Sequence, residues 1–398
     1  MKKTLIIISV FCVVFMPALA EWNQVPNNLQ EPIVDLAATD TSELIALGAS
    51  GNIFVSVDFG QTFQLTYDAG PNDRMNALYA NSLLQYACGE NGKIIEYNGS
   101  GWVESNTQTT NQLNDIHFSD NQFGFAVGEL GTILKTEDGG NNWDTVNSPT
   151  NQWLTSVFVF DPNNVKIVGD GGLVIGTTNG GQTWDQTIIP GQPWLGSVWL
   201  NSPTNGWFSG TDGILYLMDE FGYSQYNTGT TNGIVSLNIP FPNYGHGVGD
   251  NGYITHWNGT TWDEIAGPTT DWLYAVTSAY NNDSKLNEVN VYSYACGENG
   301  TILASTDVVL GINTPAFPSK NVFLYPNPAS ENTFLSGLLE GEKAEVTIAS
   351  VTGTNICSVH LEHPLHITLP LAGLADGTYL VSVKTDRGIF VEKLIIRH

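Results

Sequence analysis

The chain has 398 residues, of which 39 are acidic and 13 are basic, so its formal net charge is −26. Such a negative chain repels nucleic acid and anionic lipid, and we expect neither as a partner. Only 13% of the residues are charged while glycine occurs 42 times, which favours turn-rich β-structure over helices with ion-paired faces.

The first 20 residues are typical of a cleaved secretory signal peptide. Lys2 and Lys3 form a basic start, residues 5–16 are apolar, and residues 17–20 end in a small-x-small cleavage pattern. The apolar run is shorter than the roughly 20 residues that a spanning helix needs. We therefore expect an exported chain with no membrane span after signal removal; an uncleaved anchor is the alternative.

Residues 21–310 contain a unit that recurs about every forty residues. The third unit shows four short segments with alternating polarity, at 113–118, 123–127, 132–136 and 142–146. Each unit also carries one anchoring glycine. These are Gly51, Gly92, Gly131, Gly172, Gly213, Gly252 and Gly300. Four strands in each of seven units predict an all-β fold, a seven-bladed β-propeller.

The last unit lacks a fourth strand, and the start of the mature chain supplies the missing pattern. Trp22-Asn-Gln-Val repeats the sequence type of Trp143-Asp-Thr-Val. We therefore predict that residues 21–26 form the outer strand of blade 7, which closes the ring and covers a sheet edge. The same unit has eight additional residues near 281–290, and we expect them to form a polar surface loop.

Three turns between third and fourth strands resemble the Asp-box, S/T-x-D-x-G-x-x-W/F. They begin at Ser56, Thr136 and Thr177, and the third has Asn in place of Asp. In such a turn the carboxylate caps backbone N–H groups, the glycine takes a positive φ and the aromatic packs between blades. We therefore assign the recurring fourth-strand aromatics to the core. These are Phe63, Trp102, Trp143, Trp184 and Trp262.

The whole repeat resembles the propellers of photosystem II assembly (stability) factors over residues 21–310. The resemblance rests on a Val-Gly-acid-x-Gly-x-Ile centre, as in residues 127–133, and it implies the fold rather than a photosynthetic function. Asp-boxes also occur in sialidases, which resemble one another in clamping a substrate carboxylate with three arginines. Residues 21–319 contain one arginine, Arg74, so a sialidase is excluded.

The C-terminal residues differ in composition from the repeats. Residues 320–398 hold 6 basic and 8 acidic residues, against 5 and 31 in residues 21–319, and a proline-containing linker at 311–320 separates the two parts. Tyr325-Pro-Asn-Pro, Gly377-Thr-Tyr and Lys393-Leu-Ile-Ile occur in the order found in the type IX secretion C-terminal sorting domain, which residues 321–398 resemble. The resemblance implies a small Ig-like β-sandwich, contact with the secretion machinery, delivery to the medium or cell surface, and a Bacteroidota source. An unrelated β-sandwich tail is the alternative.

Two sets of aligned residues are candidate ligand contacts. The turns between second and third strands carry Glu90, Glu129, Asp170, Asp250 and Glu298, and the connections into first strands carry Arg74, Gln112, Trp153, Trp194 and Trp272. Both positions lie on one face of a four-stranded propeller, so the acids form a broken ring beside indoles that suit sugar rings or apolar groups. Alternatively the carboxylates cap turns or hold Ca²⁺, and the indoles fill gaps between blades.

The sequence carries no catalytic or metal motif. We find no nucleophile elbow, phosphate loop or metal-ligand spacing, and expect His117, His246 and His256 to be isolated and Cys88 and Cys296 to be buried thiols. We expect no catalytic residue, metal or cofactor. The favoured function is an exported, non-catalytic propeller that binds a glycan, peptide or protein. A glycoside hydrolase with paired carboxylates on that face and an envelope assembly factor are the alternatives.

Overall fold

A computed structural model describes residues 21–70, 74–81, 83–219, 221–283 and 288–310, together with 323–325, 332–336, 343–350, 355–361, 367–371, 374–375, 377–385 and 388–396. The predicted signal peptide and the linker at 311–320 lie outside these residues. The chain forms two compact units, one with the residues up to Val309 apart from Pro240–Pro242, and one with the residues from Leu310.

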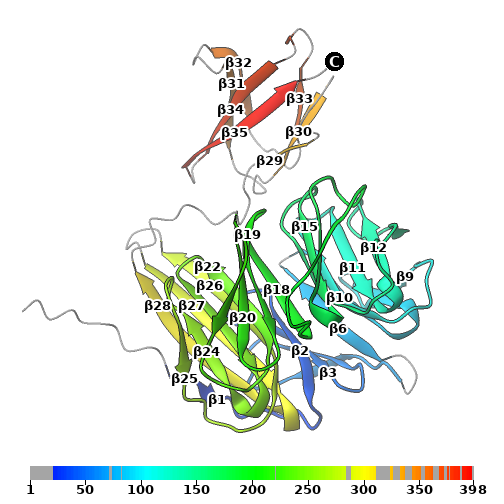
Figure 1. Ribbon diagram of the computed structural model, residues 1–398, viewed down its shortest axis with the longest axis vertical. Coiled ribbons are helices and arrows are strands. Elements are labelled where there is room, and N and C mark those ends of the chain that lie inside the picture. The colour runs from blue at the N-terminus through cyan, green and yellow to red at the C-terminus, as the bar shows by residue number, and fades with distance from the viewer. Residues whose placement is uncertain are drawn as a thin grey trace, which may run out of the picture. The chain divides into compact units, whose positions relative to one another are not determined.

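The first unit consists of seven four-stranded sheets, the blades of a propeller (Figure 1). Blades 1 and 2 contain β2 (Ile33–Ala38), β3 (Leu44–Gly48), β4 (Ile53–Ser56), β5 (Gln64–Tyr67), β6 (Met75–Ala80), β7 (Gln85–Gly89), β8 (Ile94–Tyr97) and β9 (Trp102–Ser105). Blades 3 and 4 contain β10 (Leu113–Phe118), β11 (Gly124–Gly128), β12 (Ile133–Thr136), β13 (Asp144–Thr145), β14 (Leu154–Val159), β15 (Val165–Gly169), β16 (Leu173–Thr177) and β17 (Asp185–Ile188). Blades 5 and 6 contain β18 (Leu195–Ser202), β19 (Asn205–Gly210), β20 (Ile214–Asp219), β21 (Gly222–Asn227), β22 (Ile234–Phe241), β23 (Tyr244–Gly249), β24 (Ile254–Trp257) and β25 (Trp262–Ile265). Blade 7 contains β26 (Leu273–Asp283), β27 (Glu288–Gly297), β28 (Ile302–Leu310) and β1 (Asn23–Gln24).

The N-terminal strand closes the ring, which confirms the prediction. β1 pairs antiparallel with β28, with Asn23 opposite Ala304 and Gln24 opposite Leu303. The N–H of Val25 continues the ladder and donates to the carbonyl of Ile302 at 2.8 Å. The strand from the start of the chain therefore covers the outer edge of the last blade.

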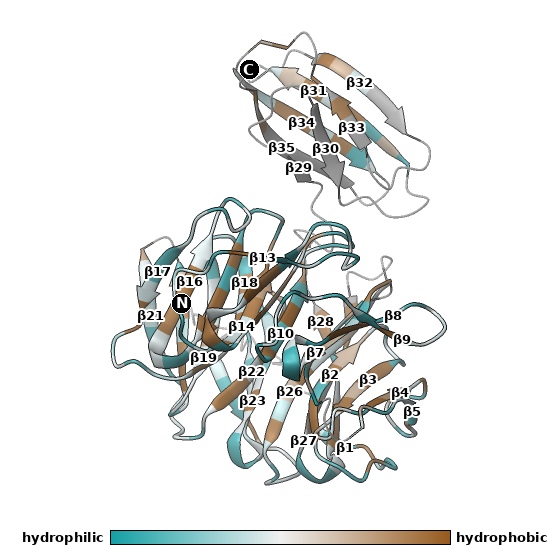
Figure 2. Ribbon diagram, turned by 90° about the vertical axis from the view of Figure 1, so that its right-hand side faces the viewer, coloured by the Kyte–Doolittle hydropathy of each residue, from teal (hydrophilic) through white to brown (hydrophobic). Residues whose placement is uncertain are grey.

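The hydrophobic core is divided into seven clusters, one between each pair of neighbouring blades. Trp22, only 1% exposed, packs with Val248 of blade 6 and Leu273 of blade 7. Leu36 of blade 1 shares a cluster with Cys296 of blade 7. Figure 2 shows the hydrophobic residues concentrated along the strands and the hydrophilic ones along the connections. Burial between blades therefore holds the ring closed, and Cys88 and Cys296 are buried and free, as predicted.

Two carboxylates on innermost strands bridge neighbouring blades. Asp35 of β2 accepts the N–H of Leu78 in blade 2 at 2.6 Å, and Asp115 of β10 accepts the N–H of Val157 in blade 4 at 2.8 Å. Burial raises the pKa of Asp35 to about 7 and raises that of Asp115 as well. These side chains serve the architecture of the ring.

The additional residues of blade 7 extend a hairpin. From Ala275 onward β26 and β27 pair as far as Asp283 opposite Glu288. The prediction of a polar loop was therefore wrong for residues 281–283 and 288–290, and its remaining part, 284–287, lies outside the described residues. A strand ladder is built from backbone groups, so polar side chains at a hairpin end do not prevent pairing.

The second unit contains two small sheets. One contains β29 (Phe323–Tyr325), β30 (Asn332–Ser336) and β33 (Ile367–Pro370), and the other contains β31 (Ala344–Ser350), β32 (Asn355–Leu361), β34 (Gly377–Thr385) and β35 (Gly388–Ile396). Leu369 of the first sheet shares a buried cluster with Val346 and Val381 of the second. The all-β prediction holds for this unit too.

Candidate functional site

One backbone hydrogen bond in each blade joins the two candidate positions. The residue that begins the turn between second and third strands donates its N–H to the carbonyl of the residue that precedes the first strand. The pairs are Glu90 with Arg74, Glu129 with Gln112, Asp170 with Trp153, Asp250 with Gly233 and Glu298 with Trp272, at 2.9–3.1 Å, and Ala49 with Pro32 at 2.8 Å and Thr211 with Trp194 at 3.4 Å. The two predicted sets therefore lie on the same face of the ring.

The glycine that precedes each acid permits this close approach. A Cβ atom at Gly128 would lie 1.9 Å from the carbonyl oxygen of Gln112, and one at Gly249 would lie 1.8 Å from that of Gly233. The acids then begin short 3-10 turns. These are η1 (Glu90–Gly92), η2 (Glu129–Gly131), η3 (Asp170–Gly172), η4 (Asp250–Gly252) and η5 (Glu298–Gly300). The glycine is thus a requirement of backbone packing, whereas the acid is not, because Ala49 and Thr211 take its place in two blades.

The five acidic side chains fall into two groups. The carboxylate of Asp250 accepts the N–H of Gly233 at 2.9 Å, and that of Glu298 accepts the N–H of Trp272 at 3.3 Å. Turn capping therefore accounts for two of the acids. Within the described part of the chain, three half-buried carboxylates accept no hydrogen bond: Glu90, Glu129 and Asp170.

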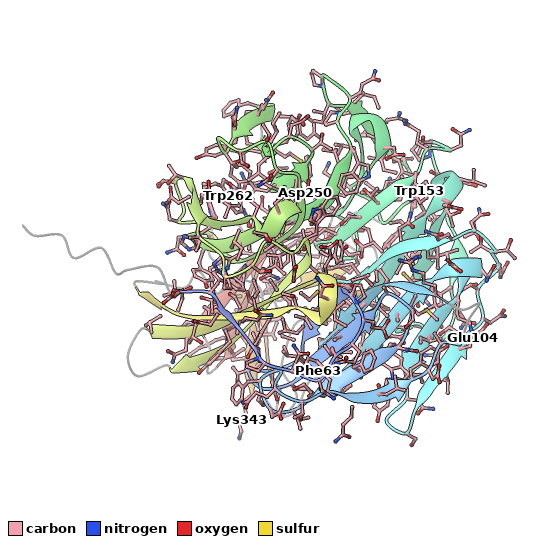
Figure 3. The ribbon with its side chains drawn as sticks, turned by 90° about the horizontal axis from the view of Figure 1, so that it is seen from below. Phe63, Glu104, Trp153, Asp250, Trp262 and Lys343 are labelled. Atoms are coloured by element: carbon pink, nitrogen blue, oxygen red, sulfur yellow. The ribbon has the colours of Figure 1, made fainter. Side chains whose placement is uncertain are left out.

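The three indoles are exposed. Trp153, Trp194 and Trp272 are 43%, 38% and 47% exposed, so none is buried between blades. The ring of Trp194 lies against Gly196 at the start of innermost strand β18, where a Cβ atom would fall 2.7 Å from the indole. Arg74 is also exposed, whereas the amide of Gln112 donates to Asn114 at 2.9 Å. Figure 3 labels Trp153 and Asp250, which belong to different blades.

Sequence reasoning missed Leu130, the second residue of η2. Its φ is +55°, a conformation that bulky side chains avoid, and its side chain is 68% exposed. Five other turns place residues suited to this conformation at the aligned position: Asn91, Gly171, Asp212, Asn251 and Asn299. The aligned repeats carried the signal, because a leucine stands where asparagine, glycine or aspartate is usual.

Backbone hydrogen bonds link the turns of blades 3 and 4 to the connections that follow them. The N–H of Gly131 donates to the carbonyl of Gln152 at 2.9 Å, beside Trp153, and the N–H of Gly172 donates to that of Pro193 at 2.6 Å, beside Trp194. We give the name aromatic–acidic arc to the unpartnered acids and the exposed apolar side chains on this face in blades 2 to 5. It consists of Glu90, Glu129, Leu130, Trp153, Asp170 and Trp194.

The prediction that the histidines are isolated was wrong for two of them. His246 and His256 lie opposite each other on β23 and β24, with ring centroids 5.2 Å apart. Their separation by ten positions gave no periodic signal, because strand register brings them together. Within the described residues, no group of three or more His, Cys, Asp or Glu side chains could hold a metal ion, and no helix has the length and hydrophobicity to cross a bilayer.

Comparison with protein families matches both parts of the chain. The family model of the photosynthesis system II assembly factor YCF48 matches residues 98–224, and that of the secretion system C-terminal sorting domain matches residues 323–397. The chain combines a YCF48-like propeller domain with a secretion sorting domain. The sorting domain implies secretion or sorting to the cell surface.

Solved structures share the fold of the YCF48-like propeller. One described as YCF48 bound to D1 peptide is 16% identical with a TM-score of 0.57, covering 73% of this chain and 99% of the other. YCF48 from Cyanidioschyzon merolae is 15% identical with a TM-score of 0.57, covering 72% and 99%. The WD40 propeller of Doa1 is 14% identical with a TM-score of 0.56, covering 72% and 96%. No curated protein sequence matches the chain.

Proposed function

We propose that this chain is an exported, non-catalytic binding protein whose propeller holds a polypeptide segment on the aromatic–acidic arc. One observation carries the proposal. Three carboxylates that accept no hydrogen bond within the described residues lie on the same face as Leu130, Trp153 and Trp194, whose apolar side chains are exposed. Such a surface suits a segment that carries both basic and apolar side chains.

The charge of the propeller supports a cationic ligand. Residues 21–319 hold 31 acidic and 5 basic residues. Lys93 is already paired with Glu104 at 3.5 Å, and Lys135 is paired with Glu137. The summed field therefore attracts positive groups and repels anionic ones. The similar solved propeller with a bound peptide supports a polypeptide as the ligand class.

A glycan is the second candidate, because exposed indoles suit the C–H faces of sugar rings. A neutral glycan leaves the charge of three neighbouring carboxylates unused, which is why we favour the polypeptide. A glycoside hydrolase requires two carboxyl groups at a defined separation. Glu90, Glu129 and Asp170 belong to three different blades, so this alternative has less support.

We propose export because a signal peptide at the N-terminus and a sorting domain at the C-terminus would both direct the chain out of the cell. We propose a signal peptide at 1–20, the propeller at 21–310, a linker at 311–320 and the sorting domain at 321–398. The last of these would contact the secretion machinery and leave the propeller outside the cell. The ligand would then be an extracellular or surface polypeptide.

The test compares two variants of equal net charge. The arc variant carries Glu90→Gln, Glu129→Gln and Asp170→Asn, and the control carries Asp144→Asn, Asp185→Asn and Glu264→Gln, which are exposed acids on outer strands. Both are assayed against a peptide array with graded basic and apolar content. We expect the arc variant, but not the control, to weaken binding about tenfold and to reduce its salt dependence. Equal loss in both variants, or binding to glycans without any peptide, would contradict the proposal.

A further inference from the structure

A pocket of about 190 Å³ lies between the outer strands of blades 1 and 2. Its lining includes Glu43, which precedes β3, and Gln64 and Thr66 of β5. Glu43 precedes β3, whereas the turn on the face of the arc follows the end of β3. The two ends of this strand lie toward opposite faces of the ring, so the pocket lies toward the face opposite the arc. It is therefore separate from the aromatic–acidic arc.

Trp102 and Tyr97 form the aromatic wall of the pocket. Trp102 and Trp184 are only partly buried, whereas Trp143 and Trp262 at the aligned position are 2% and 4% exposed, so the assignment of Trp102 and Trp184 to the core was wrong in part. The indole N–H of Trp102 donates to the Thr66 hydroxyl of blade 1 at 3.3 Å. Its ring lies 5.7 Å from that of Tyr97, which is 36% exposed. Two aromatic rings are thus held at the pocket.

The polar groups of the pocket have unused hydrogen-bonding capacity. Among the residues that the structure describes, the side chains of Glu43, Gln64 and Gln85 have no hydrogen-bond partner. Two carboxamides offer donors and acceptors, and the carboxylate offers acceptors. Carboxamides and carboxylates suit the hydroxyls of a sugar, and aromatic faces suit its C–H faces.

We propose that this pocket binds a single neutral pyranose ring, with Trp102 and Tyr97 packing on its C–H face and Glu43, Gln64 and Gln85 binding its hydroxyls. The volume is below the roughly 300–1,000 Å³ of pockets for drug-sized ligands, which limits the occupant to one ring. The carboxylate of Glu43 disfavours anionic sugars. The site goes beyond the proposed function of the arc and does not depend on it.

The test uses saturation-transfer NMR and titration calorimetry on the full chain with methyl glycosides of glucose, galactose, mannose and N-acetylglucosamine. We expect at least one to bind with a dissociation constant of millimolar order, and Gln64→Ala and Tyr97→Ala each to weaken it about tenfold. Both side chains are exposed, so melting temperatures should be unchanged.

Two controls make the result specific. Leu65→Ala alters the opposite side of the same strand, where Leu65 is 52% exposed, and Trp153→Ala alters the arc; neither should change glycoside affinity. The proposal is overturned by the absence of transfer to every glycoside, or by binding that survives both pocket substitutions. Binding of N-acetyl-lysine methylamide without any glycoside would also overturn it, since the pocket would then take an amino-acid side chain.

Discussion

The indole of Trp22 lies edge-on to the imidazole of His246, with ring centroids 5.1 Å apart. Through this contact the N-terminal segment touches blade 6 as well as pairing with blade 7. His246 and His256 are both buried, and burial lowers the pKa of each imidazole, with the neighbouring His256 lowering that of His246 further. The closure of the ring therefore rests on histidines that must remain neutral.

Acid should weaken the propeller at this contact. The folded state holds the pKa of His246 well below 6.5, so its stabilising contribution is complete above pH 6.5 and is lost progressively as the pH falls below it. We expect urea denaturation to give a smaller free energy of unfolding at about pH 5 than at about pH 7.5. His246→Phe keeps an aromatic ring against Trp22 and should reduce this loss; an unchanged pH dependence in that variant would contradict the assignment.

The contribution of Asp35 to the pH dependence of stability should have the opposite sign to that of His246. Its pKa rises from 3.8 to about 7 through burial, so its protonated form stabilises the fold fully below pH 3.8 and this contribution is lost as the pH rises through about 7. Asp35→Asn should remove that slope. Asp35→Ala should cost about 1–3 kcal/mol, because it leaves the N–H of Leu78 without its acceptor. Asp144→Ala, on an exposed outer strand, serves as the control and should leave stability unchanged in denaturant titrations.

Removal of the closing segment should open the ring. Trp22→Ala should lower the free energy of unfolding by about 3–5 kcal/mol, because the indole is almost completely buried. Deletion of residues 21–26 should lower the melting temperature sharply, since the edge of β28 loses its partner. Calorimetry measures both changes, with Glu21→Ala, an exposed neighbour, as the matched control. A deletion variant that melts like the parent chain would show that β1 is dispensable.

The glycines before the acidic turns should tolerate no side chain. In Gly128→Ala the new methyl group would lie 1.9 Å from the Gln112 carbonyl oxygen, so the turn must move away from the connection. We expect a loss of more than about 3 kcal/mol, or failure to fold. Gly101→Ala, with no atom within 4 Å, should change stability by less than about 0.5 kcal/mol. Similar chemical-denaturation midpoints for the two variants would refute the close-packing argument.

Leu130→Asn should separate stability from binding. Asparagine adopts the left-handed conformation readily, as in Asn91, so relief at φ +55° should stabilise the propeller by roughly 1 kcal/mol. The same change removes an exposed apolar side chain from the arc and should weaken peptide binding. Thermal unfolding and calorimetric titration measure the two effects. A variant that is more stable and binds equally well would remove Leu130 from the proposed site.

Repetition explains why most of the fold was predictable. Seven aligned glycines and a displaced Trp22 pattern were enough to predict the blades and the closing strand, because each feature meets the same backbone demand in every unit. The order of the strands within a blade was enough to predict that Glu129 and Trp153 lie on the same face of the ring.

Features particular to one blade were harder to predict. The pairing of His246 with His256 depends on register, and the indole of Trp102 binds a hydroxyl of the neighbouring blade, which no repeat pattern indicates. The conformation of Leu130 becomes visible only when it is set against the other turns. Which carboxylates cap a backbone N–H, as Asp250 does, and which remain unpartnered is decided by side-chain geometry that a repeat pattern does not encode.

The pairing of Asn23 with Ala304 joins the two ends of the propeller, so almost all of it must be synthesised before the ring can close. Until then the indole of Trp22 has no neighbouring blades to pack between, and the blades form an open array. Contacts between residues so far apart in the sequence form slowly, so we expect the ring to be unclosed early in folding. The propeller therefore reaches its closed form late in folding, and the edge of β28 has no partner until β1 pairs with it.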